Sequence, residues 1–287
     1  MLGLGVLAQA SMTTHYQGMP SIGPALKATY HLSLVETGVL LTSATLGVAV
    51  TLLPWGIAAD HFGERLVLAI GLGACALFVA AAGFAPDFRT VLACFFAAGM
   101  AGAVANSASG RAVMAWFDRS ERGTALGIRQ MATPLGGALA AASLPAIYLA
   151  FGLRACFLAV AIFIAAAALA CGIWLLPAPR AARGSASAGG VSPLRDRRIW
   201  RLAMGGMLIV AGQLSFVTYV TTFLNQRRLL ALGAAGAVLA AVQLLGAAGR
   251  VGIGRLSDRL GQRIGLLRWV AVLSGGALVL TGVLVDA

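Results

Sequence analysis

The sequence predicts an all-α protein that crosses a membrane many times, and three observations lead to that fold class. Of the 287 residues, 60% are hydrophobic and only 10% are charged, whereas a soluble domain carries about 45–50% apolar and about 25% charged residues. The apolar residues gather in runs of about the 20 residues that a helix needs to span the hydrocarbon. The basic residues stand mostly in the short breaks between these runs, as in a membrane protein oriented by its loops.

Nine apolar runs are long enough to span, and the short breaks between most of them predict antiparallel neighbours. The first run is interpreted as a helix rather than a cleaved signal because no basic residue precedes it. The small residues of 97–110 predict close helix packing in the fourth run. The predicted spans are residues 2–23, 34–57, 66–85, 90–113, 124–149, 152–176, 200–224, 230–253 and 264–285.

The longest break divides the chain into two groups of helices. It runs from Pro177 to Arg198 and combines prolines, a Gly/Ser/Ala tract and a basic end, which is typical of a flexible linker. Ser192 followed by Pro193 indicates the start of the next helix. The predicted organisation is therefore a six-helix bundle over 1–176, a cytoplasmic linker over 177–198, and a partial second bundle of three helices over 199–287.

The positions of the basic residues predict the orientation. Fourteen of the 21 follow even-numbered runs and five follow odd-numbered runs. Because loops rich in Arg and Lys stay in the cytoplasm, we expect the even loops and the N-terminus there, in a multi-pass protein of the cell (inner) membrane.

One loop pattern occurs twice, after the second and the eighth runs. The first copy has Gly56, Asp60, Gly63 and Arg65, and the second repeats the spacing GxxxDxxGxR 198 residues later. Its residues are Gly254, Asp258, Gly261 and Arg263, with Arg259 inside the pattern. A repeated pattern at equivalent loops indicates an internally duplicated fold.

Each position of the pattern has a physical role. The first glycine allows close helix approach, and the aspartate can accept hydrogen bonds from the amides of a helix N-terminus. The second glycine permits a turn with positive φ, and the arginine can pair with a carboxylate or cap a helix C-terminus. These contacts would hold one state of a moving helix bundle, whereas the alternative interpretation is an ordinary turn with a cytoplasmic arginine.

The first copy, with Gly47 nine residues upstream, closely resembles the signature loop of the major facilitator superfamily of transporters. The segment 116–128, which includes Asp118 and Arg122, looks like the loop between helices four and five of that family. The resemblance implies a 6+6 helix architecture, a central cavity and alternating access by rocking of two halves. The chain carries 6+3 of those spans and therefore looks like a fragment or truncated product that lacks about three helices.

The chain also departs from the family. His61 and Glu64 stand where bases are usual, and Phe95 stands near Gly99 where the fourth helix usually has an arginine. These departures weaken the expectation of proton-driven antiport through that arginine.

Polar residues in mid-helix are costly in lipid and usually face the bundle interior. We expect such residues to line a substrate cavity, although hydrogen bonding between helices is an equal alternative and Thr13 can bond back to its own helix. The candidates are Gln9, Thr13, Tyr16, Asn106, Arg129, Gln130, Gln213, Tyr219 and Gln243.

Arg129 favours an anionic solute. It lies inside the fifth run, while every one of the nine carboxylates falls in a loop or near a helix end. A charge inside the membrane marks a functional site by default, although this arginine can also reach the interface. A proton carrier of the carboxylate type would have to lie elsewhere, or be His15.

These observations favour a secondary transporter for a small solute, preferably a small organic anion. Alternatives are a transport-inactive truncated remnant or membrane sensor and, less favoured, an exporter of drugs or metabolites. No GxxxxGK[ST] loop, GxSxG motif or metal-ligand spacing occurs, so we expect no enzyme, no cofactor and no metal. The expected partners are the substrate, a coupling ion and the lipid bilayer. The net charge is +12, but the basic residues lie between the spans, so we expect no binding to nucleic acid. We also expect a monomer.

Overall fold

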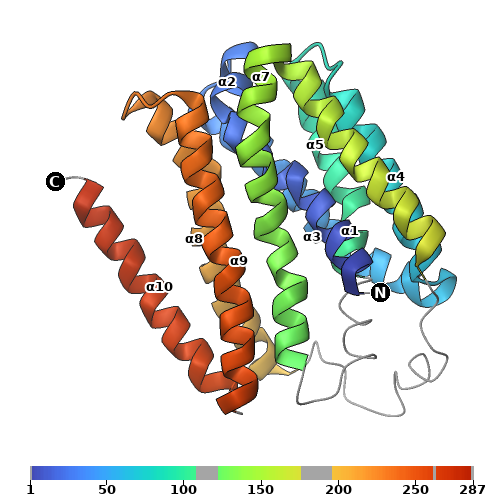
Figure 1. The fold of residues 1–287 in the computed structure, drawn as a ribbon, viewed down its shortest axis with the longest axis vertical. Helices are drawn as coiled ribbons and strands as arrows, with labels where there is room; N and C mark the ends of the chain where they lie inside the picture. The colour runs from blue at the N-terminus through green and yellow to red at the C-terminus, as the bar shows by residue number, and fades with distance from the viewer. Residues whose placement is uncertain (1, 108–121, 176–195, 261–262, 286–287) are drawn as a thin grey trace.

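The computed structural model describes residues 2–107, 122–175, 196–260 and 263–285. Its helices run up and down a single assembly (Figure 1). Six of the described helices are long and apolar enough to cross a membrane, so the predicted all-α polytopic class is confirmed. In chain order the elements are α1 (Leu2–Tyr16), η1 (Met19–Ile22), α2 (Gly23–Thr29), α3 (Leu34–Phe62), α4 (Glu64–Ala82), α5 (Phe88–Gly102), α7 (Arg122–Trp174), α8 (Arg197–Gln226), α9 (Leu232–Leu260) and α10 (Arg263–Val285).

The first predicted span, 2–23, is not one helix. α1 ends at Tyr16, a short 3-10 helix follows at Met19–Ile22, and α2 continues from Gly23. Pro20 explains the interruption because it has no N–H to donate to the carbonyl of Tyr16, as an α-helix would require. The break places η1 where it can contact other helices of the assembly.

The second and eighth predicted spans were too short. α3 continues past residue 57 to Phe62, and α9 continues past residue 253 to Leu260, so Asp60 and Asp258 lie in the last turns of helices and not in loops. The loss of apolar residues marks where the membrane span ends, but backbone hydrogen bonds can extend a helix beyond that point. α3 ends at Gly63, whose φ of 85° favours glycine.

The fifth and sixth predicted spans form the two arms of α7. The chain reverses at Gly152, which has φ 78° and ψ −179°. We call Arg122–Phe151 the first arm and Leu153–Trp174 the second arm; they are the green and yellow segments of Figure 1.

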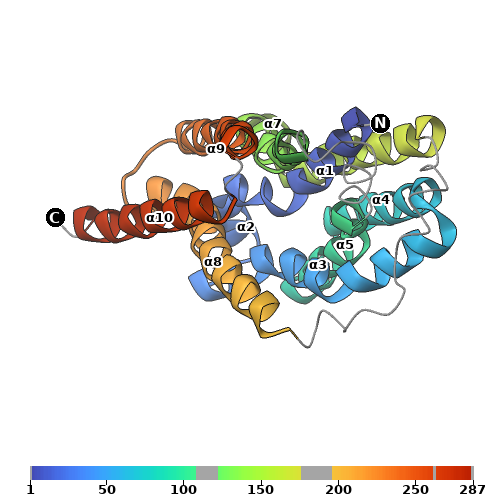
Figure 2. The ribbon, with the colours of Figure 1, turned by 90° about the horizontal axis from the view of Figure 1, so that it is seen from below.

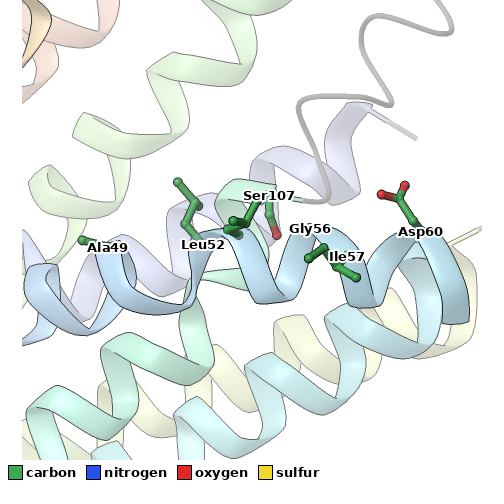
Figure 3. A pocket seen from close by; sticks show the side chains of 7 residues that line it. Ala49, Leu52, Gly56, Ile57, Asp60 and Ser107 are labelled. Atoms are coloured by element: carbon green, nitrogen blue, oxygen red, sulfur yellow. The ribbon is translucent and has the colours of Figure 1, made fainter. Parts of the chain in front are cut away.

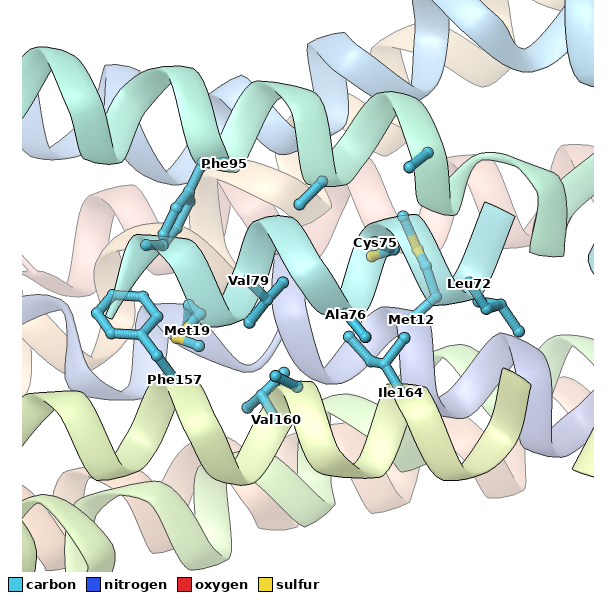
Figure 4. Close-up of a cluster of buried hydrophobic side chains, with 14 of the residues drawn as sticks. Met12, Met19, Leu72, Cys75, Ala76, Val79, Phe95, Phe157, Val160 and Ile164 are labelled. Atoms are coloured by element: carbon cyan, nitrogen blue, oxygen red, sulfur yellow. The ribbon is translucent and has the colours of Figure 1, made fainter. Parts of the chain in front are cut away.

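The core of the assembly lies within the group α1–α7, which we call the first bundle. Figure 4 shows part of it, with Phe95 and Phe157 near one end of the cluster and Met12 and Leu72 near the other, all at zero to 1% exposure. α3 and α5 approach closely, because a Cβ on Gly99 would collide with the carbonyl of Ala44. Close packing, expected for 97–110, is therefore seen in the described part of that stretch.

The second bundle, α8–α10, joins the first through α9. α9 lies alongside the first arm of α7 (Figure 1), whereas α10 lies at the edge of the assembly (Figure 2). The C-terminal ends of α3 and α9 lie at the same end of the assembly (Figure 1), which we call the signature end because their last turns carry Asp60 and Asp258. At the opposite end, called the far end, α8 contacts η1 and α2.

Candidate functional site

A cluster of polar side chains joins α1 to Asn106, four residues after the end of α5, and to the first arm of α7. The amide Nε2 of Gln9 donates to Oδ1 of Asn106 at 2.8 Å and to Oγ1 of Thr133 at 3.5 Å. Gln9 is 1% exposed, and its Oε1 is buried without a hydrogen-bond partner among the described residues. An unpaired buried acceptor is costly, so this oxygen is suited to a ligand that donates a hydrogen bond.

Arg129 lies beside this cluster, on the first arm of α7. Its Nη2 donates to the backbone carbonyl of Asn106 at 2.9 Å, and its Nη1 donates to Oε1 of Gln130 at 3.3 Å. The side chain is 8% exposed. The cation is therefore buried within the assembly, and both of these contacts use neutral oxygen acceptors.

Gln17 and Gln243 connect the two bundles within the assembly. Nε2 of Gln243, on α9, donates to Oε1 of Gln17 at 3.2 Å, and both side chains are buried. A Cβ on Gly137 would collide with Gln243, so the glycine provides the space for this bond. The pair therefore links the chain just after α1 to α9 of the second bundle.

Arg250 on α9 is a second cation at this contact, and the sequence prediction missed it as a site residue. It lies within electrostatic range of Tyr16, which also interacts with Thr133. Arg250 and Gln130 line a cleft of about 510 Å³ between α7, α9 and α10. Its sequence position could have identified it as a site residue, because it stands eight residues before Asp258 and more than two turns before the end of α9.

The remaining cavity candidates lie in different surroundings. The hydroxyl of Thr13 bonds to carbonyls of its own helix, at 2.8 Å to Ala10 and 3.0 Å to Gln9. Gln213 lies half-buried in the middle of α8. The hydroxyl of Tyr219 lies against Gly38, where α8 meets α3. Tyr219 therefore belongs to a contact between the bundles and not to the cluster around Gln9.

His15 lies apart from the polar cluster. It is fully buried in the first bundle, and its ring meets the ring of Phe95 edge-on with centroids 4.7 Å apart. Its surroundings are those of a core side chain, so its placement does not favour the role of proton carrier considered from the sequence.

The second copy of the signature pattern makes a contact between the bundles. The Asp258 carboxylate accepts hydrogen bonds from the backbone N–H of Gly123 at 3.0 Å and of Thr124 at 2.7 Å, and from the Thr124 hydroxyl at 2.8 Å. Gly123 and Thr124 stand in the first turn of α7, where the helix dipole favours negative charge. A Cβ on Gly254 would lie 2.6 Å from the Gly123 carbonyl, so this glycine allows the approach. Arg259, next to Asp258, is exposed.

The first copy lies at the same end, over the last turns of α3 and the start of α4. Asp60 and Gly56 line a pocket of about 480 Å³ together with Ser107. Figure 3 shows Asp60 near the end of α3. Nε of Arg65 donates to the carbonyl of Gly172 at 2.6 Å, in the last turn of α7. A Cβ on Gly47 would collide with the Phe96 carbonyl, so Gly47 is a close-approach position.

Some predicted residues fall outside the described part of the chain. Asp118 and Gly261 do so, as do the side chains of Arg122 and Arg263. Among the described carboxylates, all six lie at or within a turn of a helix end: Glu36, Asp60, Glu64, Asp87, Asp196 and Asp258. Within the same residues, no three His, Cys, Asp or Glu side chains gather as metal ligands would.

Comparison with known sequences supplies the family of the chain. The Major Facilitator Superfamily model matches residues 3–286. An uncharacterized MFS-type transporter of Mycobacterium tuberculosis is 33% identical over 282 residues, which are 98% of this chain and 63% of that protein. The chain thus spans less than two thirds of this relative.

Two further similarities agree with that match. A probable L-galactonate transporter of Escherichia coli is 26% identical over 249 residues, covering 80% of this chain and 54% of that protein. The crystal structure of a bacterial homologue of the human lysosomal transporter Spinster, inward-facing and unoccupied, superimposes with a TM-score of 0.70 at 17% identity. It covers 90% of this chain and 62% of that chain, and at this identity it supports the fold alone.

Proposed function

Because the chain belongs to the major facilitator superfamily of membrane transporters, we propose that it moves a small organic anion across the membrane by alternating access. It is a multi-pass membrane protein of a family that transports small solutes and does not catalyse reactions. The class of solute and the mechanism are our proposal.

The observation that carries the proposal is the buried guanidinium of Arg129. It donates hydrogen bonds to Asn106 and Gln130, next to the cluster around Gln9, and the described carboxylates stand at or near helix ends. A guanidinium suits carboxylates because its fork of N–H donors matches their two oxygens. A cationic solute would find no described carboxylate in mid-span to bind it.

Two further features support an anion that also carries hydroxyl groups. Arg250 lines the cleft that Gln130 also borders, so the solute would meet a second cation on the way to the cluster. The unpaired Oε1 of Gln9 is an acceptor that a solute hydroxyl can satisfy. The E. coli relative is named as a probable transporter of L-galactonate, a hydroxylated carboxylate.

The same proposal assigns an orientation. We place the signature end at the cytoplasm of an inner membrane, because the helix ends that carry Arg65, Arg197 and Arg259 lie there. Opening and closing would then exchange access between the cleft beside Arg250 and the far end. The Asp258 contact would hold the signature end closed in one of those states.

Uptake by the reconstituted chain tests the function. We expect liposomes that contain the purified protein to accumulate labelled galactonate or another sugar acid saturably. Labelled choline and a neutral sugar alcohol, supplied at the same concentration, should enter no faster than into empty liposomes. Saturable choline uptake without uptake of any sugar acid would refute the proposal.

A further inference from the structure

We propose that three buried hydroxyls at the far end, those of Ser21, Thr221 and Thr222, keep the contact between the two bundles there easy to open. We call these residues the hydroxyl seam. The inference concerns the balance between open and closed states and holds whatever solute the protein carries.

The seam lies where the interrupted first span meets α8. Ser21 belongs to η1, and Thr221 and Thr222 stand in the last two turns of α8. η1 and α8 are in contact, and a Cβ on Gly23 would lie 3.2 Å from Oγ1 of Thr222. The break at Pro20 thus presents the backbone after α1 to a polar stretch of the second bundle.

Within the part of the chain that the structure describes, all three hydroxyl oxygens are buried without a hydrogen-bond partner. Ser21 and Thr221 are 0% exposed and Thr222 is 4% exposed. The buried hydroxyls of Thr14 and Ser43, in contrast, bond to carbonyls of their own helices, at 2.6 Å to Ser11 and at 2.7 Å to Leu40. The seam is therefore exceptional among the described hydroxyls.

An unpaired hydroxyl is unfavourable only while the contact is closed. When the bundles separate at the far end, water can hydrate each seam oxygen and remove the cost. Leaving one buried hydroxyl unpaired is enough to shift a two-state equilibrium by roughly fivefold to a hundredfold. The seam therefore favours opening, although it packs as a closed contact.

The neighbouring contacts at the far end are weak as well. Nζ of Lys27 donates to Oε1 of Gln226 at 3.3 Å in an exposed position, and the Tyr219 hydroxyl packs on Gly38. The signature end, in contrast, holds a carboxylate with three hydrogen bonds across the bundles. This difference between the ends makes the far end the easier of the two to open.

The proposal predicts that removing a polar group from this contact between the bundles stabilises it. Thr221→Val and Thr222→Val keep the shape of the side chain but remove the unpaired oxygen, so they should stabilise the closed contact. Ser21→Ala removes the oxygen from the other bundle and should act in the same direction. If hydroxyls held the contact together, the same variants would loosen it.

Hydrogen–deuterium exchange of the purified chain in liposomes tests this. We expect each variant to slow exchange at least about fivefold in peptides from both sides of the seam, residues 17–31 and 216–230. Thr14→Val is the matched control, since its hydroxyl is buried but bonded within α1; it should leave the peptide 216–230 unchanged. Thr221→Ser should behave as the parent because it retains a hydroxyl.

Other outcomes are equally decisive. Unchanged or faster exchange in Thr221→Val and Thr222→Val would overturn the proposal. Slowing confined to 216–230 would also overturn it, because it would mean that α8 alone had become more stable. If a valine variant does not fold, Ser21→Ala supplies the same test from η1. None of these readouts requires transport, so failure of the proposed function would leave them unaffected.

Discussion

Replacing Arg129 by glutamine should weaken the binding of an organic carboxylate by roughly a hundredfold or more, because it leaves a desolvated anion without its cation. Arg129→Lys should recover only part of the loss, since an ammonium cannot match both carboxylate oxygens. Affinity measured by calorimetry on the purified chain gives both values.

Arg154→Gln is the matched control for this experiment. That arginine is exposed at the far end, where its Nε donates to the Gly83 carbonyl at 3.4 Å and its guanidinium stacks on Phe84. It also carries one positive charge, so its loss changes the net charge equally but should leave affinity unchanged. Equal affinities for the Arg129→Gln protein and the parent would remove Arg129 from the site.

Replacing Asp258 by asparagine should open the signature end. The amide nitrogen would meet the N–H donors of α7, and the charge that favours a helix N-terminus would be lost. We expect the equilibrium to move towards the open state by about a hundredfold, corresponding to about 3 kcal/mol for charge-assisted hydrogen bonds. The alkylation rate of a cysteine introduced at Leu126, which lines the cleft, reports this opening.

Asp196→Asn controls for the general effect of losing a carboxylate at a helix N-terminus. Asp196 accepts a hydrogen bond from the N–H of Arg198 at 2.8 Å within its own helix start, so it does not connect the bundles. Its replacement should leave the Leu126→Cys alkylation rate unchanged. If Asp258→Asn does the same, the carboxylate does not hold the bundles together.

The sequence predicts the helices well and their ends poorly, for a physical reason. Apolar runs report burial in lipid, which is why the spans around Leu72 or Phe157 fall where expected. They do not report backbone hydrogen bonding, so the extension of α3 to Phe62 and of α9 to Leu260 was missed. The break after Tyr16 could have been found from Pro20, which was overlooked within an apolar run.

The site is predictable only in part. A mid-span polar residue such as Gln9 or Arg129 is visible because its type is costly in lipid. The hydrogen-bond partners of such residues cannot be predicted from the sequence. The bond from Gln243 to Gln17, for example, joins residues that are 226 positions apart. Arg250 stands three residues before the predicted end of its span at 253, whereas α9 continues to Leu260, so its distance from the helix end was underestimated. The unpaired state of Ser21 can be known only from three-dimensional contacts.

The most direct test of the central claim compares each sugar acid with its neutral sugar alcohol, such as galactonate with galactitol, for binding to the purified chain. The acid and its alcohol carry similar hydroxyl groups, but only the acid has a carboxylate. If the buried guanidinium of Arg129 selects an anion, at least one acid should bind saturably and its alcohol at least about a hundredfold more weakly. Equal binding of the members of each pair, or binding of alcohols alone, would contradict the account.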